Sequence, residues 1–188
     1  MEDQEIYDEL NKIPDIIEEE RPSKFKKTFI IIIAVFLMFL LVTYLTSNSL
    51  ISNIFIGLIQ SDKINNNIVS INSTNNLIFQ DNVYDDLLKI YDSNPELEFK
   101  VCLNGKILNG DYYINDIYVP ETYLQTSNKV IADSCPDYTI VDMHSHPLKH
   151  CVPSEQDFNS FKLFKEKNNN AIMAVMCERG RFNFYVWF

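Results

Sequence analysis

The sequence has little positive charge. It holds 16 Lys and Arg residues against 26 Asp and Glu residues, which gives a formal net charge of −10 at pH 7. The acidic excess extends over the whole chain, because residues 1–27 hold nine acidic and five basic side chains and residues 28–188 hold seventeen and eleven. Neither part offers the positive field that a phosphate backbone requires. We therefore expect no nucleic acid partner.

Paired cysteine motifs are also missing. Cys102, Cys135, Cys151 and Cys177 form no Cys-x-x-Cys pair, so the sequence does not support a structural zinc held by four thiolates. Cys102 and Cys177 fall in expected strands and are predicted to be buried thiols. Cys135 and Cys151 fall in expected loops at opposite ends of one strand, which argues against a bond between them. If the domain is exported, a disulfide between another pair of these cysteines remains an alternative.

No charged residue interrupts Thr28–Thr46. This apolar run has the length of about 20 residues that a helix needs to cross a hydrocarbon core. It therefore predicts a transmembrane helix. The alternative is a cleaved signal peptide, but that would have a shorter apolar region and a briefer leader, and no clean cleavage site follows here.

Basic residues flank this run on one side only. Arg21, Lys24, Lys26 and Lys27 precede it, and the first basic residue after it is Lys63. The positive-inside rule then predicts a single-pass membrane protein with its N-terminus in the cytoplasm. The large C-terminal part would lie on the outer side.

Three further segments surround the apolar run. Residues 1–27 form an acidic tail, of which we expect residues 1–23 to be disordered. Residues 47–76 include Leu50–Gln60, whose apolar residues recur at helical spacing, and the Asn- and Ser-rich Ser61–Asn76. Leu50–Gln60 either extends the membrane helix or lies as an amphipathic helix on the lipid headgroups. Ser61–Asn76 is interpreted as a tether, so the globular domain is expected to cover residues 77–188.

Alternating helix and strand patterns predict an α/β (α+β) domain from residue 77 onward. Helices are expected over Asp81–Ser93 and Ser154–Lys167, the latter with Phe158, Phe161 and Phe164 in the core. A hairpin turn is expected at Asn104-Gly105 and a loop over Thr122–Ser127. Strands are expected over Leu97–Leu103, Lys106–Leu108, Asp111–Val119, Lys129–Ala132, Tyr138–Met143, Asn170–Cys177 and Arg181–Phe188. This order indicates a curved, mixed, largely antiparallel sheet flanked by helices.

The most informative motif follows the expected strand Tyr138–Met143. His144 and His146 are two residues apart, so their side chains lie on one face of an extended chain and can converge on one ion. Asp157 lies at the start of the next expected helix and can add an oxygen ligand. Two histidines and one carboxylate leave the fourth position of a zinc ion open, which is typical of catalytic zinc sites.

The complete motif is His-x-His-Pro, six residues, then Ser-x-x-Asp, from His144 to Asp157. It resembles the signature of the JAMM zinc metalloproteases, also called the JAB or MPN domain. The resemblance covers residues 77–188. It implies the α/β sandwich fold with a curved, largely antiparallel sheet that was inferred above, a Zn²⁺ cofactor, and hydrolysis of a peptide or isopeptide bond. The substrates it implies are proteins, with conjugates of ubiquitin-like proteins as one class.

Two further site residues follow from the resemblance alone. Glu98 precedes the segment Val101-Cys102-Leu103-Asn104-Gly105, as the general base does in the family. Glu96 is the competing carboxylate, since alternation puts it on the same side. Ser154 corresponds to the serine that hydrogen-bonds the oxyanion, and its sequence context also predicts a helix N-cap. The third histidine, His150, lies in the variable loop and is not assigned to the metal.

The sequence thus predicts a membrane-anchored zinc metallopeptidase. Two alternatives remain: a non-catalytic JAMM module that serves as a membrane-attached scaffold, and an amidase that acts on a small sulfur-carrier protein. The chain carries no long insertion of the kind with which eukaryotic deubiquitinases of this family embrace ubiquitin, so its grip on a substrate is expected to be weaker or shared with a partner.

Overall fold

The computed structural model describes residues 24–47, 49–147 and 149–186. The disordered tail expected at residues 1–23 lies outside the described residues, as do Asn48, Leu148 and the end of the last expected strand at residues 187–188. The chain divides into two compact units, Met1–Leu45 and Thr46–Phe188. The second unit thus begins 31 residues before Leu77, where the sequence placed the boundary between tether and globular domain.

The first unit holds all but the last two residues of α2, which covers Lys24–Ser47. It includes the predicted run Thr28–Thr46 and begins one turn earlier. The helix is long and apolar enough to cross a membrane, and no residue of its most apolar window is buried. Its composition matches the prediction of a membrane-spanning helix.

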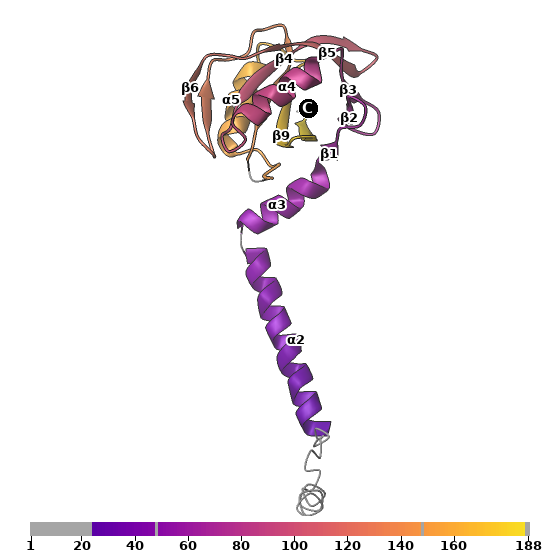
Figure 1. The fold of residues 1–188 in the computed structure, drawn as a ribbon, viewed down its shortest axis with the longest axis vertical. Coiled ribbons are helices and arrows are strands. Elements are labelled where there is room, and N and C mark those ends of the chain that lie inside the picture. Colours follow the sequence, from indigo (N-terminus) through magenta and orange to yellow (C-terminus); the bar gives the residue numbers. More distant parts are fainter. Residues whose placement is uncertain (1–23, 48, 148, 187–188) are drawn as a thin grey trace, which may run out of the picture. The chain divides into compact units, whose positions relative to one another are not determined.

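The second unit is built on an eight-stranded sheet with the order β1-β10-β9-β8-β4-β5-β3-β2 (Figure 1). The pairs β3–β5 and β8–β9 are parallel and the others antiparallel. The edge strands β1 and β2 follow one another in the chain and are joined by a bridge between Asn65 and Ile68, so the sheet is nearly closed. Its strands are β1 (Asp62–Lys63), β2 (Ile68–Ser70), β3 (Asn76–Phe79), β4 (Lys100–Leu108), β5 (Asp111–Tyr118), β8 (Thr139–Ser145), β9 (Ile172–Glu178) and β10 (Arg181–Tyr185).

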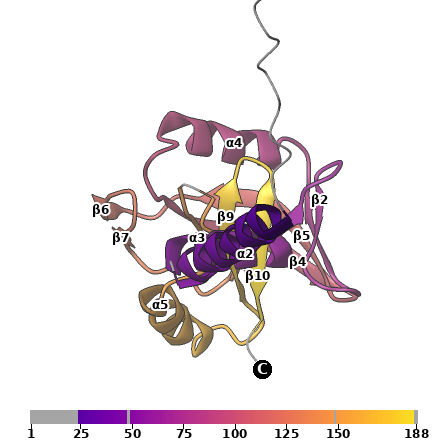
Figure 2. The same cartoon turned by 90° about the horizontal axis from the view of Figure 1, so that it is seen from below.

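Helices α4 (Val83–Ser93) and α5 (Glu155–Lys165) cover opposite faces of the sheet (Figure 2). Successive side chains of a strand point to opposite faces of the sheet, so every second residue faces α4 and the residues between them face α5. The face of α4 holds the larger core, to which Leu87, Val141 and Met143 belong. The face of α5 holds Phe161, Phe164 and Met173, with Phe158 packed beside them. This confirms the predicted mixed, mostly antiparallel architecture and the core role of the three phenylalanines.

Two local predictions in this region are wrong. The chain does not turn at Asn104-Gly105, because β4 continues through both residues with a bulge and turns only before β5. Gly105 suits that bulge, since an added Cβ would collide with the Tyr113 carbonyl. The expected loop Thr122–Ser127 contains β6 (Thr122–Gln125), which pairs with β7 (Val130–Ala132) in a separate two-stranded sheet.

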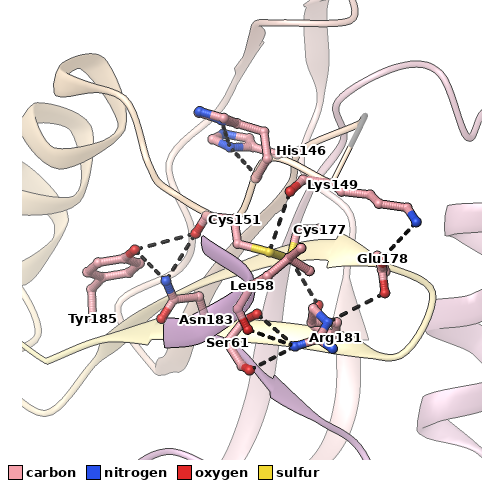
Figure 3. The surroundings of a disulfide bond; sticks show 11 residues. Leu58, Ser61, His146, Lys149, Cys151, Cys177, Glu178, Arg181, Asn183 and Tyr185 are labelled. Atoms are coloured by element: carbon pink, nitrogen blue, oxygen red, sulfur yellow. Dashed lines mark hydrogen bonds and ion pairs between the residues drawn. A yellow bond between two sulfur atoms is a disulfide. The ribbon is translucent and has the colours of Figure 1, made fainter. Parts of the chain in front are cut away.

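The expected tether is part of the domain. Its residues form β1 and β2, and Val69 is 1% exposed in the main core. The segment before it forms the helix α3 (Ser49–Gln60). Arg181 Nη1 donates hydrogen bonds to the carbonyls of Leu58 and Ser61 at 3.3 and 3.0 Å and so fixes the end of α3 (Figure 3).

All four cysteines are paired. Cys102 is bonded to Cys135, and Cys151 to Cys177. The prediction that Cys102 and Cys177 are buried thiols is therefore wrong as to their chemistry, although both are buried. Cys135 and Cys151 are not bonded to each other, as predicted. The second disulfide ties the loop after β8 to β9, directly beside α3 (Figure 3).

Candidate metal centre

The two histidines of the motif lie at the end of β8, on the face of the sheet that α5 covers. Every residue of β8 is buried, so the strand is held from both sides. In the ladder with β4, His144 pairs with Lys100 and Asp142 with Cys102. His144 and His146 therefore point to the same side as Asp142, as the period of two predicts.

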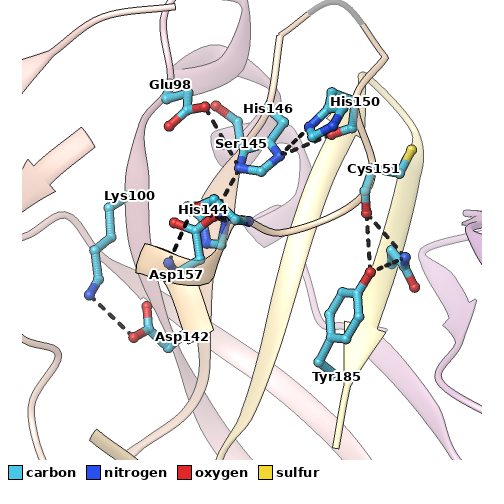
Figure 4. Close-up of polar contacts among 12 residues, drawn as sticks. Glu98, Lys100, Asp142, His144, Ser145, His146, His150, Cys151, Asp157 and Tyr185 are labelled. Carbon is cyan, nitrogen blue, oxygen red and sulfur yellow. Dashed lines mark hydrogen bonds and ion pairs between the residues drawn. The ribbon is translucent and has the colours of Figure 1, made fainter. Parts of the chain in front are cut away.

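Asp157 approaches these histidines from the first turn of α5 (Figure 4). Its Oδ2 atom lies 3.5 Å from Nε2 of His144 and 3.4 Å from Nε2 of His146. Ligands about 2.0–2.1 Å from a tetrahedral zinc ion lie about 3.3 Å from one another. The two separations from Asp157 are close to this value, and all three ligand atoms lie within 4.8 Å of one another, so the three side chains form a group that could hold a metal ion.

A buried nitrogen supports this fit. Nε2 of His144 is fully buried and has no hydrogen-bond partner among the described residues. Such an atom is costly unless it is satisfied in another way, and a bond to a metal satisfies it. On His146, Nδ1 lies 3.1 Å from the carbonyl oxygen of His150. A proton on Nδ1 donated to that carbonyl leaves the lone pair on Nε2 free for a metal.

The helix cap holds Asp157 in place. Ser154 is the N-cap of α5, and together with Asp157 it forms a capping box. The amide and the hydroxyl of Ser154 both donate to Oδ2 of Asp157 at 2.7 Å. Burial acts to raise the pKa of Asp157, but contacts with His144, His146 and Ser154 outweigh it and hold the pKa well below its usual value. The carboxylate is therefore ionised, as a metal ligand must be.

Glu98 is the carboxylate that the fold brings to the site. It is 6% exposed, and its Oε1 lies 3.7 Å from Nε2 of His146. Glu96 is exposed, and no contact joins it to the histidines among the described residues. Burial is the main cause that raises the pKa of Glu98 to about 7; His146 lowers it and Asp157 raises it further. A carboxyl group with a pKa near 7 can both accept and return a proton at neutral pH.

Two cavities flank the group of ligands. One has a volume of about 200 Å³ and is lined by His144, Asp157, Lys100 and Asp142, together with residues of β7 and α5. Nζ of Lys100 lies 3.2 Å from Oδ2 of Asp142, and both side chains are largely buried. The other cavity, of about 330 Å³, is lined by His146, Glu98 and Ser154 and by residues of α3 and of the loop before β7.

The structure adds residues that the sequence did not reveal. Lys100 lies two residues after Glu98, and Asp142 lies two residues before His144, so each shares a strand face with that site residue. This spacing of two was the signal in the sequence that could have identified both. His150 was predicted to have a surface role, but it is half-buried and its Nδ1 lies 3.3 Å from Nδ1 of His146. Burial, and after it His146, lower the pKa of His150, which favours its neutral form. No local signal linked α3 to the site.

No protein-family model matches the chain, and no curated protein matches it either. The function therefore has to be inferred from the geometry of the site and from the motif that supplies its ligands.

Proposed function

We propose that the chain is a membrane-anchored, zinc-dependent metallopeptidase of the JAMM type. The observation that carries the proposal is the convergence of His144 Nε2, His146 Nε2 and the Asp157 carboxylate, with the carboxylate of Glu98 beside them. A structural zinc site would close all four positions with protein ligands. Here three ligands and a neighbouring carboxyl group of suitable pKa match a site that performs hydrolysis.

Each side chain has a distinct task in this proposal. Zinc bound by the three ligands would activate water and polarise the scissile carbonyl. Glu98 accepts the proton of the attacking water and returns it to the leaving amine, for which a pKa of about 7 is suitable. Ser154 positions Asp157 in the resting site and turns its hydroxyl toward the developing oxyanion during the reaction.

The substrate proposal follows from the resemblance of the motif. JAMM enzymes hydrolyse amides, and we propose a peptide or isopeptide bond as the target, such as one at the C-terminus of a ubiquitin-like protein. A complete set of ligands with a buried Glu98 favours an enzyme over a non-catalytic scaffold, because a scaffold does not need a buried carboxylate whose pKa is raised.

The disulfides support an orientation for the chain. Disulfides persist in oxidising compartments and are rare in the cytosol, and both cysteine pairs of the domain are bonded. Basic residues precede α2, so the positive-inside rule gives the same result. We propose a single-pass protein with a cytoplasmic N-terminus and its domain outside the cytosol.

The test uses the full chain in detergent micelles. Zinc content is measured by atomic absorption, and hydrolysis by cleavage of isopeptide-linked and linear ubiquitin dimers and of ubiquitin-like fusions. We expect one zinc per chain, lost in Asp157→Asn and retained in Glu155→Gln, an exposed acid in the same helical turn. Zinc binding without hydrolysis of any amide would favour the scaffold. Absence of zinc from the folded protein would contradict the proposal.

A further inference from the structure

We propose that α3 forms one wall of the substrate site and that Ile54 on this helix selects substrates with a large apolar side chain next to the scissile bond. This inference rests on the proposed function and adds a specificity residue to it. The motif does not include α3, which lies about ninety residues before the histidines in the chain.

Three contacts attach α3 to the domain beside the metal ligands. Gly57 is buried against the loop after β8, so closely that an added Cβ would lie 2.8 Å from Cβ of Cys151. Arg181 donates to Oγ of Ser61 at 3.1 Å, in addition to its bonds to the carbonyls at the end of the helix. The disulfide from Cys151 to Cys177 holds the loop on which Gly57 rests (Figure 3). These contacts fix the side of α3 that carries Ile54.

The cavity of about 330 Å³ joins this helix to the reacting groups. Ile54 lines it together with Glu98, His146 and Ser154, which are the proposed base, a metal ligand and the oxyanion donor. Pro147, His150 and, from the loop before β7, Ser127 and Asn128 line the same cavity. A substrate group in the cavity would therefore lie beside the proposed base and the metal ligand His146, which face one another in Figure 4.

The size and lining of the cavity determine which group it accepts. Ligand pockets start at about 300 Å³, and an apolar cavity of about 150 Å³ already holds benzene. Ile54 and Pro147 present hydrocarbon, and the described wall carries no Lys, Arg or Asp. Among the described lining residues the only carboxylate is that of Glu98, which is engaged in the proposed reaction. A leucine, isoleucine or phenylalanine side chain fits these conditions, whereas a charged side chain finds no partner.

The second cavity differs in chemistry and provides the comparison. Its lining combines the ion pair of Lys100 with Asp142 and the hydroxyl groups of Ser134 and Ser160 with apolar side chains of β7 and α5. A peptide across the metal centre thus meets a cavity with a largely buried ion pair on one side and the cavity of Ile54, which has no such pair among its described lining residues, on the other. We infer that the selection for an apolar group arises on the side of α3.

Binding of two zinc-chelating probes tests this inference without catalysis. N-acetylleucine hydroxamate and N-acetylglycine hydroxamate are titrated calorimetrically into the zinc-loaded full chain in micelles. Burial of the leucine side chain should make the first probe bind about 10- to 100-fold more tightly. Ile54→Asp and Ile54→Trp should each reduce this preference to less than about threefold, the first by polarity and the second by filling the cavity. Both should leave the affinity for the glycine probe unchanged.

Ile131→Asp is the matched control, because Ile131 lines the other cavity and is 39% exposed. It should leave the leucine preference intact. If the wild type binds zinc and the glycine probe but shows no leucine preference, or if the preference survives both substitutions of Ile54, the inference is overturned and the metal site stands. If the wild type takes up no zinc, the proposed function fails, and the inference fails with it.

Discussion

Oε1 of Glu98 lies 3.7 Å from Nε2 of His146, and both side chains are at least nine-tenths buried. The contact joins two segments that are far apart in the chain, since Glu98 precedes β4 and His146 follows β8. The ladder between these strands aligns them, and it continues beyond β4 through a bond from the amide of Ser145 to the carbonyl of Phe99. The position of the carboxylate beside the metal ligands is thus a consequence of strand register.

Replacement of this carboxylate should separate binding from chemistry. Glu98→Gln keeps the size of the side chain but cannot accept a proton, so we expect full zinc content and a fall in kcat of about 10²- to 10⁴-fold. Glu96→Gln is the matched control two residues away and should keep the wild-type rate. Zinc content and cleavage of the best substrate are measured on the same preparations. Full activity of Glu98→Gln would refute the role of Glu98 as general base.

The raised pKa of Glu98 also predicts how the stability of the metal-free protein depends on pH. Glu98 has a pKa of about 7 in the folded chain and 4.5 as its reference. Between pH 4.5 and pH 7, Glu98 therefore keeps its proton in the folded state and has lost it in the unfolded state. The stability of the folded state consequently falls as the pH rises from about 4.5 to about 7. The loss attributable to Glu98 is at most about 3 kcal/mol.

Urea unfolding of chelator-treated protein measures this effect. Gln does not titrate, so metal-free Glu98→Gln should gain stability relative to the wild type through that pH window and keep a constant advantage above it. Glu96→Gln should follow the wild type at every pH. A difference between Glu98→Gln and the wild type that is independent of pH would contradict the raised pKa.

Ser154 has two tasks that substitutions can separate. Ser154 is the N-cap of α5, so Ser154→Ala should lower the free energy of unfolding by about 1 kcal/mol. The same substitution removes the proposed oxyanion donor, so kcat should fall by about 10²- to 10³-fold, with little change in KM. Ser154→Thr keeps a hydroxyl and should retain most of both. If Ser154→Ala loses stability but keeps its kcat, the residue is a cap alone.

The disulfides should differ in their effect on the metal site. Each closes a loop, with separations of 33 and 26 residues, and in the chain-entropy account loops of this size contribute about 3–4 kcal/mol each. Cys151→Ser/Cys177→Ser also frees the loop whose His150 carbonyl contacts His146. Because such supporting contacts orient a ligand, zinc affinity should fall about 10- to 100-fold.

Cys102→Ser/Cys135→Ser is the control for this comparison. It should cost similar stability, because its loop is of similar length, but zinc affinity should change less than about threefold. Competition with a fluorescent zinc chelator measures the affinities, and thermal unfolding measures the stabilities. Equal effects of both pairs on zinc affinity would show that the loop after β8 does not orient His146.

The features predicted correctly from the sequence depend on neighbours in the chain. The shared face of His144 and His146 follows from the period of a strand, and the cap at Ser154 follows from its distance to Asp157. Glu98 was found only through the resemblance of its segment, because nothing local distinguishes it from Glu96. What distinguishes them is burial against His146, which depends on the pairing of β4 with β8.

The features missed depend on long-range pairing of short segments. Strands of two and three residues, β1 and β2, are too short for any periodicity, and their Asn- and Ser-rich context is typical of a linker. Asn104-Gly105 has the composition of a hairpin turn, but the pairing of β4 on both sides carries the strand through it. The cysteine partners likewise come together only in the folded sheet.

The domain boundary gives the last prediction. A fragment of residues 46–188 contains the whole second unit and should fold as a monodisperse protein with a cooperative thermal transition. A fragment of residues 77–188 loses β1 and β2, which pair with β10 and β3, and removes the buried Val69. It also leaves Arg181 without the carbonyls of Leu58 and Ser61.

The shorter fragment should therefore lose several kcal/mol of stability and expose two open sheet edges, which favours aggregation. Size-exclusion chromatography and circular dichroism of the two fragments, each prepared with intact disulfides, make the comparison. If residues 77–188 alone give a monomer that melts at the temperature of residues 46–188, then α3, β1 and β2 do not stabilise the domain. In that case the attachment of α3 by Arg181 and Gly57 would also be in doubt, and with it the wall of the cavity that Ile54 lines.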